Sequence, residues 1–125
     1  MHVRQLIVKG ARGQVACQQC AVADRPLSRL RGLIGRSALA PGEGLLLSPT
    51  PSIHTWFMRF PIDAVFLDAE LRVLDISRDL RPWRFAGRRR TRAVLELPGG
   101  EARRIGLEAG TVLEFSAREE GGNGI

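Results

Sequence analysis

Long hydrophobic runs are absent from this chain of 125 residues. No segment approaches the roughly 18 apolar residues of a membrane-spanning helix, which excludes a helical membrane span. The N-terminal residues MHVRQLIVKG also lack the apolar core and the small-residue cleavage site of a secretory signal peptide. We therefore expect a cytoplasmic protein from the sequence as it stands, or an exported protein if a leader has been removed.

Lysine is nearly absent, since Lys9 is the only one, and arginine carries almost all of the positive charge. The formal net charge is +6 and the sequence pI is about 11.1. A basic chain attracts nucleic acid or an anionic membrane surface. Coding bias produces the same excess of arginine, so charge alone does not select a class of partner.

The remaining composition is that of a globular protein, with 44% hydrophobic and 26% charged residues. The length fits one domain with a proper core, and the sequence has no internal repeat. We expect a single β-domain over residues 1–118, followed by a disordered tail over residues 119–125.

Short segments rich in β-forming residues alternate with Gly and Pro along the chain. Strands are predicted at Val3 to Lys9, Gln14 to Val22, Leu45 to Leu47, Ile53 to Met58, Ile62 to Leu67, Leu71 to Ser77, Ala93 to Leu97 and Thr111 to Phe115. The first two strands should form a hairpin. Helical spacing of leucines predicts a helix over residues 25–35, Glu101 to Ile105 reads as a helical turn, and Arg78 to Arg92 as a long basic loop. The fold expected is mainly β, a compact antiparallel β-sandwich or partly open barrel with one or two short helices.

The densest apolar run, from Ile53 to Asp68, contains charged residues that a plain core would not have. Asp63 should share one buried face of its strand with Val65 and Leu67, because side chains alternate along a strand. A buried carboxylate needs partners. The candidates are Arg36, Arg59 and the backbone N–H groups of residues 59–61.

His54, Asp63 and Glu96 all lie on predicted strands that could adjoin. A histidine with two carboxylates can transfer a proton or bind a metal. Their spacing matches no metal signature, so no metal or cofactor is expected. The structural alternative is that His54 packs in the core while both carboxylates neutralise arginines such as Arg36, Arg59 and Arg92.

Cys17 and Cys20 have the spacing of a redox or zinc half-site. Redox chemistry needs such a pair at a helix N-terminus, whereas these cysteines lie in a predicted strand, where positions i and i+3 point to opposite faces. A structural zinc site needs four ligands, and no second pair exists. We interpret them as two ordinary thiols.

The stretch from Arg81 to Arg92 interleaves six arginines with Trp83 and Phe85. Phosphate contacts and base stacking by such residues would suit single-stranded nucleic acid. The structural alternative, which we favour, is a solvated loop whose two aromatic side chains fold back over a sheet edge or a cleft.

Five ordered motifs resemble a known family: GLIGR (Gly32 to Arg36), GEGLLL (Gly42 to Leu47), the run from Ile53 to Asp68, DLRPWR (Asp79 to Arg84) and VLELPGG (Val94 to Gly100). Together they resemble the uncharacterised family catalogued as domain of unknown function 192, from about Ala21 to Phe115. The resemblance implies a small, mainly β domain without an established biochemical role. It also implies relatives that are often exported.

We favour a non-catalytic binding or accessory domain for an anionic or polar small ligand or a protein segment. Its predicted ligand-binding residues line a cleft rimmed by arginines; they are Arg36, His54, Trp56, Arg59, Asp63, Trp83 and Glu96. One alternative is an enzyme that uses Asp63 or Glu96 with His54, which a perturbed carboxyl pKa and a bound metal would favour. The other alternative is the binding of single-stranded nucleic acid by the arginine-rich loop, which we expect less. We expect no membrane-spanning segment.

Overall fold

The computed structural model describes residues 2–10, 14–24, 38–56 and 58–119. Nine strands and one short helix form within these residues. The strands are β1 (His2–Val8), β2 (Val15–Ala23), β3 (Glu43–Leu47), β4 (Ser52–His54), β5 (Ile62–Leu67), β6 (Val73–Leu80), β7 (Phe85–Gly87), β8 (Ala93–Pro98) and β9 (Leu113–Glu119), and the helix is α2 (Glu101–Arg104). The predicted helix over residues 25–35, Arg36 and the tail beyond Glu119 lie outside the described residues.

Seven strands form one sheet in the order β6-β5-β8-β3-β2-β1-β9. The predicted hairpin of the first two strands is confirmed, because β1 and β2 pair antiparallel. One pair departs from the expected antiparallel arrangement: β2 and β3 run parallel, with Gln19 opposite Glu43 and Ala23 opposite Leu47. Parallel neighbours of this kind cannot be joined by a tight hairpin turn.

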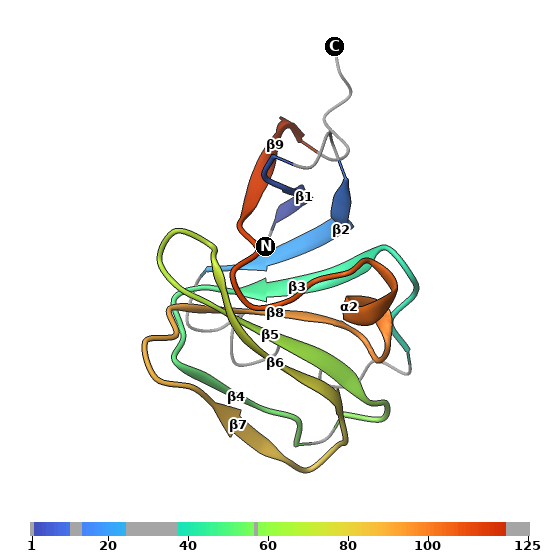
Figure 1. Ribbon diagram of the computed structural model, residues 1–125. Coiled ribbons are helices and arrows are strands. Elements are labelled where there is room, and N and C mark those ends of the chain that lie inside the picture. Colours follow the sequence, from blue (N-terminus) through green and yellow to red (C-terminus); the bar gives the residue numbers. More distant parts are fainter. Residues whose placement is uncertain (1, 11–13, 25–37, 57, 120–125) are drawn as a thin grey trace.

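The large sheet curls until its two ends approach each other (Figure 1). Arg72, just before β6, forms an isolated bridge with Val112, just before β9. The amide of Val73 donates to the carbonyl of Thr111 at 2.7 Å, and the amide of Leu113 donates to the carbonyl of Leu71 at 2.9 Å. The architecture is therefore a half-barrel, the partly open form of the predicted fold.

Two hydrophobic cores lie on opposite faces of the central strands. On β5, Val65 and Leu67 face the first core, while Ala64 and Phe66 face the second. Every residue of β5 is buried, as its nearly continuous apolar sequence predicts. The second core lies between the large sheet and the small two-stranded sheet β4–β7, which faces β5 and β6 in Figure 1.

Three predicted boundaries are wrong, and two of them lie around the small sheet. The strand expected from Ile53 to Met58 ends at His54, because the backbone turns at Thr55 to hydrogen-bond with Trp83 and Arg84. The stretch predicted as one basic loop contains the end of β6 and all of β7. The last strand, β9, also continues past the predicted end to Glu119. Within the described part of the chain, no helix is long and apolar enough to cross a membrane.

Candidate functional site

Exposed aromatic rings gather on the small sheet and the loops that flank it. Among the described residues, the exposed large hydrophobic side chains are Trp56 (47%), Trp83 (58%), Phe85 (68%) and Val3 on β1. A cluster of exposed apolar groups marks a binding surface, whereas a single exposed residue is ordinary. We call Trp56, Trp83 and Phe85, together with the neighbouring His54, the aromatic face.

The pleat of two short strands directs this face outward. Ile53 and Ala86 pair across the small sheet and are buried in the second core. Because side chains alternate along a strand, the adjacent pair His54 and Phe85 lies on the outer side. The Trp56 ring stacks on His54 with centroids 4.6 Å apart. His54 Nδ1 is buried and has no hydrogen-bond partner among the described residues.

Thr55 holds the two halves of the aromatic face together. Its side chain is fully buried, and its hydroxyl donates to the carbonyl of Arg81 at 2.6 Å and accepts from the amide of Arg84 at 2.8 Å. Its backbone carbonyl accepts from the amide of Trp83 at 3.0 Å, and its own amide donates to the carbonyl of Arg84 at 2.8 Å. The loop that carries Trp83 is therefore fastened to the end of β4, which carries Trp56.

Trp83 adopts a left-handed backbone conformation with φ of 64°. This region is uncommon for a large L-residue. Strained residues persist only when the surroundings over-determine them, and they concentrate at functional sites. The bonds to Thr55 supply that constraint here, and the strained residue presents an exposed indole ring.

Arginines surround the aromatic face. Arg59, Arg81 and Arg84 are exposed near its tryptophans, and Arg89 and Arg90 are exposed beyond β7. The surroundings of the rings are therefore strongly positive.

Arg88 has a structural role that separates it from these neighbours. Its Nε donates to Asp75 Oδ2 at 2.6 Å, and its guanidinium lies 4.8 Å from the centroid of the Phe66 ring. The hydrogen bond to Arg88 holds the pKa of Asp75 below its ordinary value. Arg88 thus ties the loop after β7 to β6.

Asp63 is a structural anchor. Its Oδ1 accepts from the amides of Asp79 (2.9 Å) and Gly100 (3.1 Å), and its Oδ2 accepts from the amide of Ala102 (2.8 Å). The expected use of backbone N–H groups is correct, but the predicted donors are wrong. The carboxylate lies on the face of the first core and joins β5 to the end of β6 and to the start of α2, whereas residues 59–61 lie before β5.

Glu96 lies on the other face of the sheet. It is 3% exposed, pairs with Leu45 and Ala64, and shares the side of Val94, which belongs to the second core. Burial raises the pKa of the Glu96 carboxyl to about 8. Since β4 packs against β8, this carboxyl lies beneath the small sheet.

The predicted site is therefore only partly assembled. His54, Trp56 and Trp83 come together on the aromatic face, with Arg59 exposed nearby. Asp63 does not join Glu96, because the two residues differ by one in strand register and so point to opposite faces.

Phe85 and Thr55 are additional residues of the aromatic face. Trp83 and Phe85 are both more than half exposed, and Phe85 belongs to β7 rather than to a loop. In the sequence, the alternation of Trp83 and Phe85 with arginines was the pattern that indicated this surface. Nothing local signalled the role of Thr55, because its partners lie 26 to 29 residues away.

Cys17 and Cys20 point to the same core, against the expectation of opposite faces. Arg4 pairs with Cys20 and Leu6 with Cys17, so β2 contains one extra residue in a β-bulge. A hydrogen bond with Cys17, together with burial, raises the pKa of the Cys20 thiol. Both thiols are free and buried, as is usual for structural cysteines.

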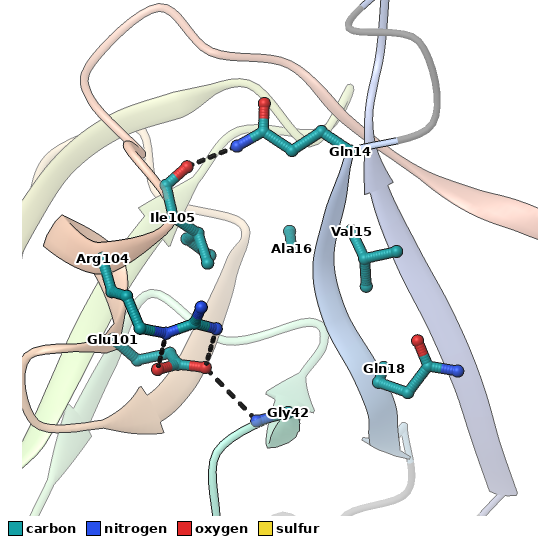
Figure 2. Close-up of a pocket in the computed structure, with 8 residues that line it drawn as sticks. All are labelled: Gln14, Val15, Ala16, Gln18, Gly42, Glu101, Arg104 and Ile105. Carbon is teal, nitrogen blue, oxygen red and sulfur yellow. Dashed lines mark hydrogen bonds and ion pairs between the residues drawn. The ribbon is translucent and has the colours of Figure 1, made fainter.

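A pocket of about 440 Å³ lies between β2 and α2 (Figure 2). It is lined by Gln14, Val15, Ala16, Gln18, Gly42, Glu101, Arg104 and Ile105, none of which was predicted to bind a ligand. The buried Glu101 binds Arg104 through two hydrogen bonds of 2.8 Å and accepts from the amide of Gly42 at 3.2 Å. The remaining guanidinium nitrogen of Arg104 points away from Glu101 in Figure 2, toward Ile105 and Ala16.

This pocket is the lesser candidate. The positive charge of Arg104 is balanced by Glu101, whose pKa the hydrogen bond to Arg104 lowers. The hydrogen bond from the amide of Gly42 ties α2 to the residue that precedes β3, and the ion pair within α2 leaves the pocket with little net charge to select a ligand. In the described part of the chain, no group of three or more His, Cys, Asp or Glu side chains is placed to hold a metal ion.

Comparison with known proteins agrees with the resemblance seen in the motifs. Residues 7–115 match the model of the family DUF192, described as "Uncharacterized ACR". The chain is similar to a UPF0127 protein of Thermococcus sibiricus, with 31% identity over 92% of this chain and 77% of the relative. It is also similar to a UPF0127 protein of Pyrococcus horikoshii, with 38% identity over 75% of this chain and 84% of the relative.

A solved structure has the same fold. A protein of unknown function from Novosphingobium aromaticivorans superposes with a TM-score of 0.79 and 26% sequence identity, and the match covers 90% of this chain and 84% of that one. Sequence and fold thus agree, and the chain belongs to the uncharacterised DUF192 family, whose curated members are named UPF0127.

Proposed function

We propose that the protein is a non-catalytic binding domain whose recognition surface is the aromatic face. The ligand is anionic and presents the planar or apolar face of a ring. The observation that carries the proposal is the exposure of Trp56, Trp83 and Phe85, three residues that the hydrogen bonds of the buried Thr55 and the pairing of β4 with β7 hold close together.

Two physical effects support this ligand class. Aromatic rings contribute large contact areas at a low cost in side-chain entropy, and they stack on the planar or apolar faces of a ligand. The arginines around the rings attract negative charge and recognise phosphate or carboxylate groups with their fixed fork of donors. The net charge of +6 acts in the same direction at long range.

The experiment uses intrinsic fluorescence, because the chain has only two tryptophans and both belong to the aromatic face. The protein is titrated with uridine monophosphate and with a sulfated heparin tetrasaccharide, and with uridine and maltotetraose as neutral controls. At least one anionic probe should change the emission with saturation, and should do so more tightly than its neutral control.

Matched variants locate the binding surface. Trp83→Ala and Phe85→Ala should weaken binding of the active probe, whereas Val3→Ala, which removes an exposed apolar side chain from β1, should not. Equal binding of neutral and anionic probes, or equal loss in the Val3 variant, contradicts the proposal.

An acid–base enzyme is the second candidate, and one observation favours it. A carboxyl with a pKa of about 8, such as that of Glu96, is protonated at neutral pH and can act as a general acid. The burial of Glu96 beneath β4 keeps it from the ring-lined surface. Carbon-detected NMR titration of Glu96 with and without the bound probe separates the two functions. A pKa that moves when the probe binds supports the enzyme, and an unchanged pKa supports the binding domain.

A further inference from the structure

We infer that the ligand of the aromatic face is a single-stranded nucleic acid. This inference rests on the proposed function and names the partner of the same surface.

The openness of the surface favours a polymer over a small molecule. Sites for small molecules bury most of the ligand in a concave pocket. The rings of Trp56, Trp83 and Phe85 are instead between 47% and 68% exposed. An exposed surface such as the aromatic face can contact one side of an extended polymer.

The order of charges and rings along the chain matches a nucleic acid strand. Arg81, Trp83, Arg84 and Phe85 alternate cationic groups with aromatic rings, as a strand alternates phosphates with bases. The stretch from Asp79 to Arg92 contains six arginines and one carboxylate, so it attracts a polyanion. Of these arginines, Arg88 is engaged with Asp75 and Phe66, while the exposed Arg84 directly precedes β7 and the exposed Arg90 lies in the loop that follows it.

The dimensions set the length of strand that the face can hold. The paired part of β4 and β7 is three residues long, about 10 Å at the usual rise of a strand. Adding the flanking Trp83 and the loop after β7 gives room for a few nucleotides. A duplex hides the faces of its bases, so stacking on exposed rings requires a single strand.

The test measures binding of fluorescein-labelled dT15 to the full chain by anisotropy in 50 mM salt. Trp83→Ala and Phe85→Ala should each weaken the affinity about tenfold or more, as the loss of a stacked base does. Arg84→Ala should weaken it and lower the slope of log affinity against log salt by about 0.7. Val3→Ala is the matched control and should bind as the unmodified protein does. Thermal unfolding checks that each variant is folded.

Competitors separate the sources of binding. A 15-base-pair duplex, inorganic polyphosphate and the heparin tetrasaccharide should each displace dT15 at least tenfold less effectively than unlabelled dT15. If polyphosphate competes as well as dT15 and Trp83→Ala has no effect, binding is by charge alone, and both this inference and the proposed function fail. If the tetrasaccharide binds in a Trp83-dependent manner and dT15 does not, the inference fails while the proposed function stands. If no probe binds, both fail.

Discussion

At the scale of single residues, the two buried carboxyl groups have opposite environments. Asp63 accepts three backbone hydrogen bonds, whereas no described residue donates a hydrogen bond to the side chain of Glu96. One residue step in strand register separates them, because Asp63 lies opposite Leu97 and Ala64 lies opposite Glu96. The carboxylate of Asp63 is therefore stabilised by its hydrogen bonds, whereas burial disfavours the ionised form of Glu96.

Replacing Asp63 with Asn should destabilise the protein strongly. The amide keeps one acceptor oxygen but places an NH₂ group against backbone N–H donors, so at least one buried amide loses its partner. Each such loss costs about 1–3 kcal/mol, and the midpoint of thermal unfolding should fall by about 5–15 °C.

Asp75→Asn is the control for this substitution. It changes an exposed ion pair with Arg88, and such pairs contribute about 0–1 kcal/mol. If the two variants have equal midpoints in thermal unfolding at pH 7, the anchoring role of Asp63 is wrong.

Glu96 should make stability fall as the pH rises from about 5 to 8. Its pKa in the folded state is about 8, against an ordinary value of 4.5, so the folded protein binds this proton more tightly than the unfolded chain does. The stabilisation is complete below the unfolded pKa and is lost as the pH approaches the folded pKa. The shift corresponds to at most about 5 kcal/mol.

The variant Glu96→Gln removes the titrating group and keeps its shape. Urea unfolding at pH 5.0, 7.0 and 8.5 should show the variant gaining stability over the unmodified protein by several kcal/mol toward pH 8.5. Parallel pH profiles for the two proteins would show that Glu96 ionises normally in the folded state.

At the scale of elements, the aromatic face depends on how the loop after β6 attaches to the end of β4. Thr55→Val keeps the shape of the side chain and removes the hydroxyl that bonds Arg81 and Arg84. The loss of these two part-buried hydrogen bonds should cost about 1 kcal/mol each. Tryptophan emission should shift to longer wavelength, because the loop that carries Trp83 loosens.

Thr111→Val is the matched control for this change. Thr111 is a half-buried residue, and its hydroxyl accepts one long, exposed hydrogen bond of 3.4 Å from the amide of Glu108. Its removal should leave both the stability and the emission nearly unchanged. An emission maximum that does not move in Thr55→Val would mean that other contacts hold Trp83.

At the scale of the whole molecule, stability should be uneven between the two sheets. The central strands β5 and β8 are buried on both faces and paired on both edges, whereas β4 and β7 are three residues long and pair only with each other. Two-stranded sheets are marginal without support, and here the support is the packing of Ile53 and Ala86 into the second core.

Amide hydrogen exchange measured by NMR should reveal this difference. Amides of β5 and β8 should exchange only through global unfolding, and amides of β4 and β7 should exchange faster, through local opening. A bound single strand should slow exchange in β4 and β7 selectively. Equal protection in both sheets would mean that the small sheet unfolds together with the large one.

Much of the fold could be predicted from local pattern, and much of the candidate site could not. The continuous apolar segments at β5 and β8 indicated buried strands, and the alternation of side chains placed Asp63 and Glu96 correctly on their own strands. The prediction that Asp63 and Glu96 come together was wrong, because the relative register of two strands is decided by pairing across the sheet. In the same way, the bulge that brings Cys17 and Cys20 to one face depends on β1 as the partner of β2.

The sequence by itself determined the mainly β character, the family and the alternation of arginines with aromatic rings, because each of these depends on neighbouring residues. Only the tertiary structure decided that Trp56, Trp83 and Phe85 share one exposed surface. Their union depends on the buried hydroxyl of Thr55, which binds residues 26 and 29 positions away. Contacts across such distances in the chain arise from packing and burial of the whole domain, which a local pattern does not contain.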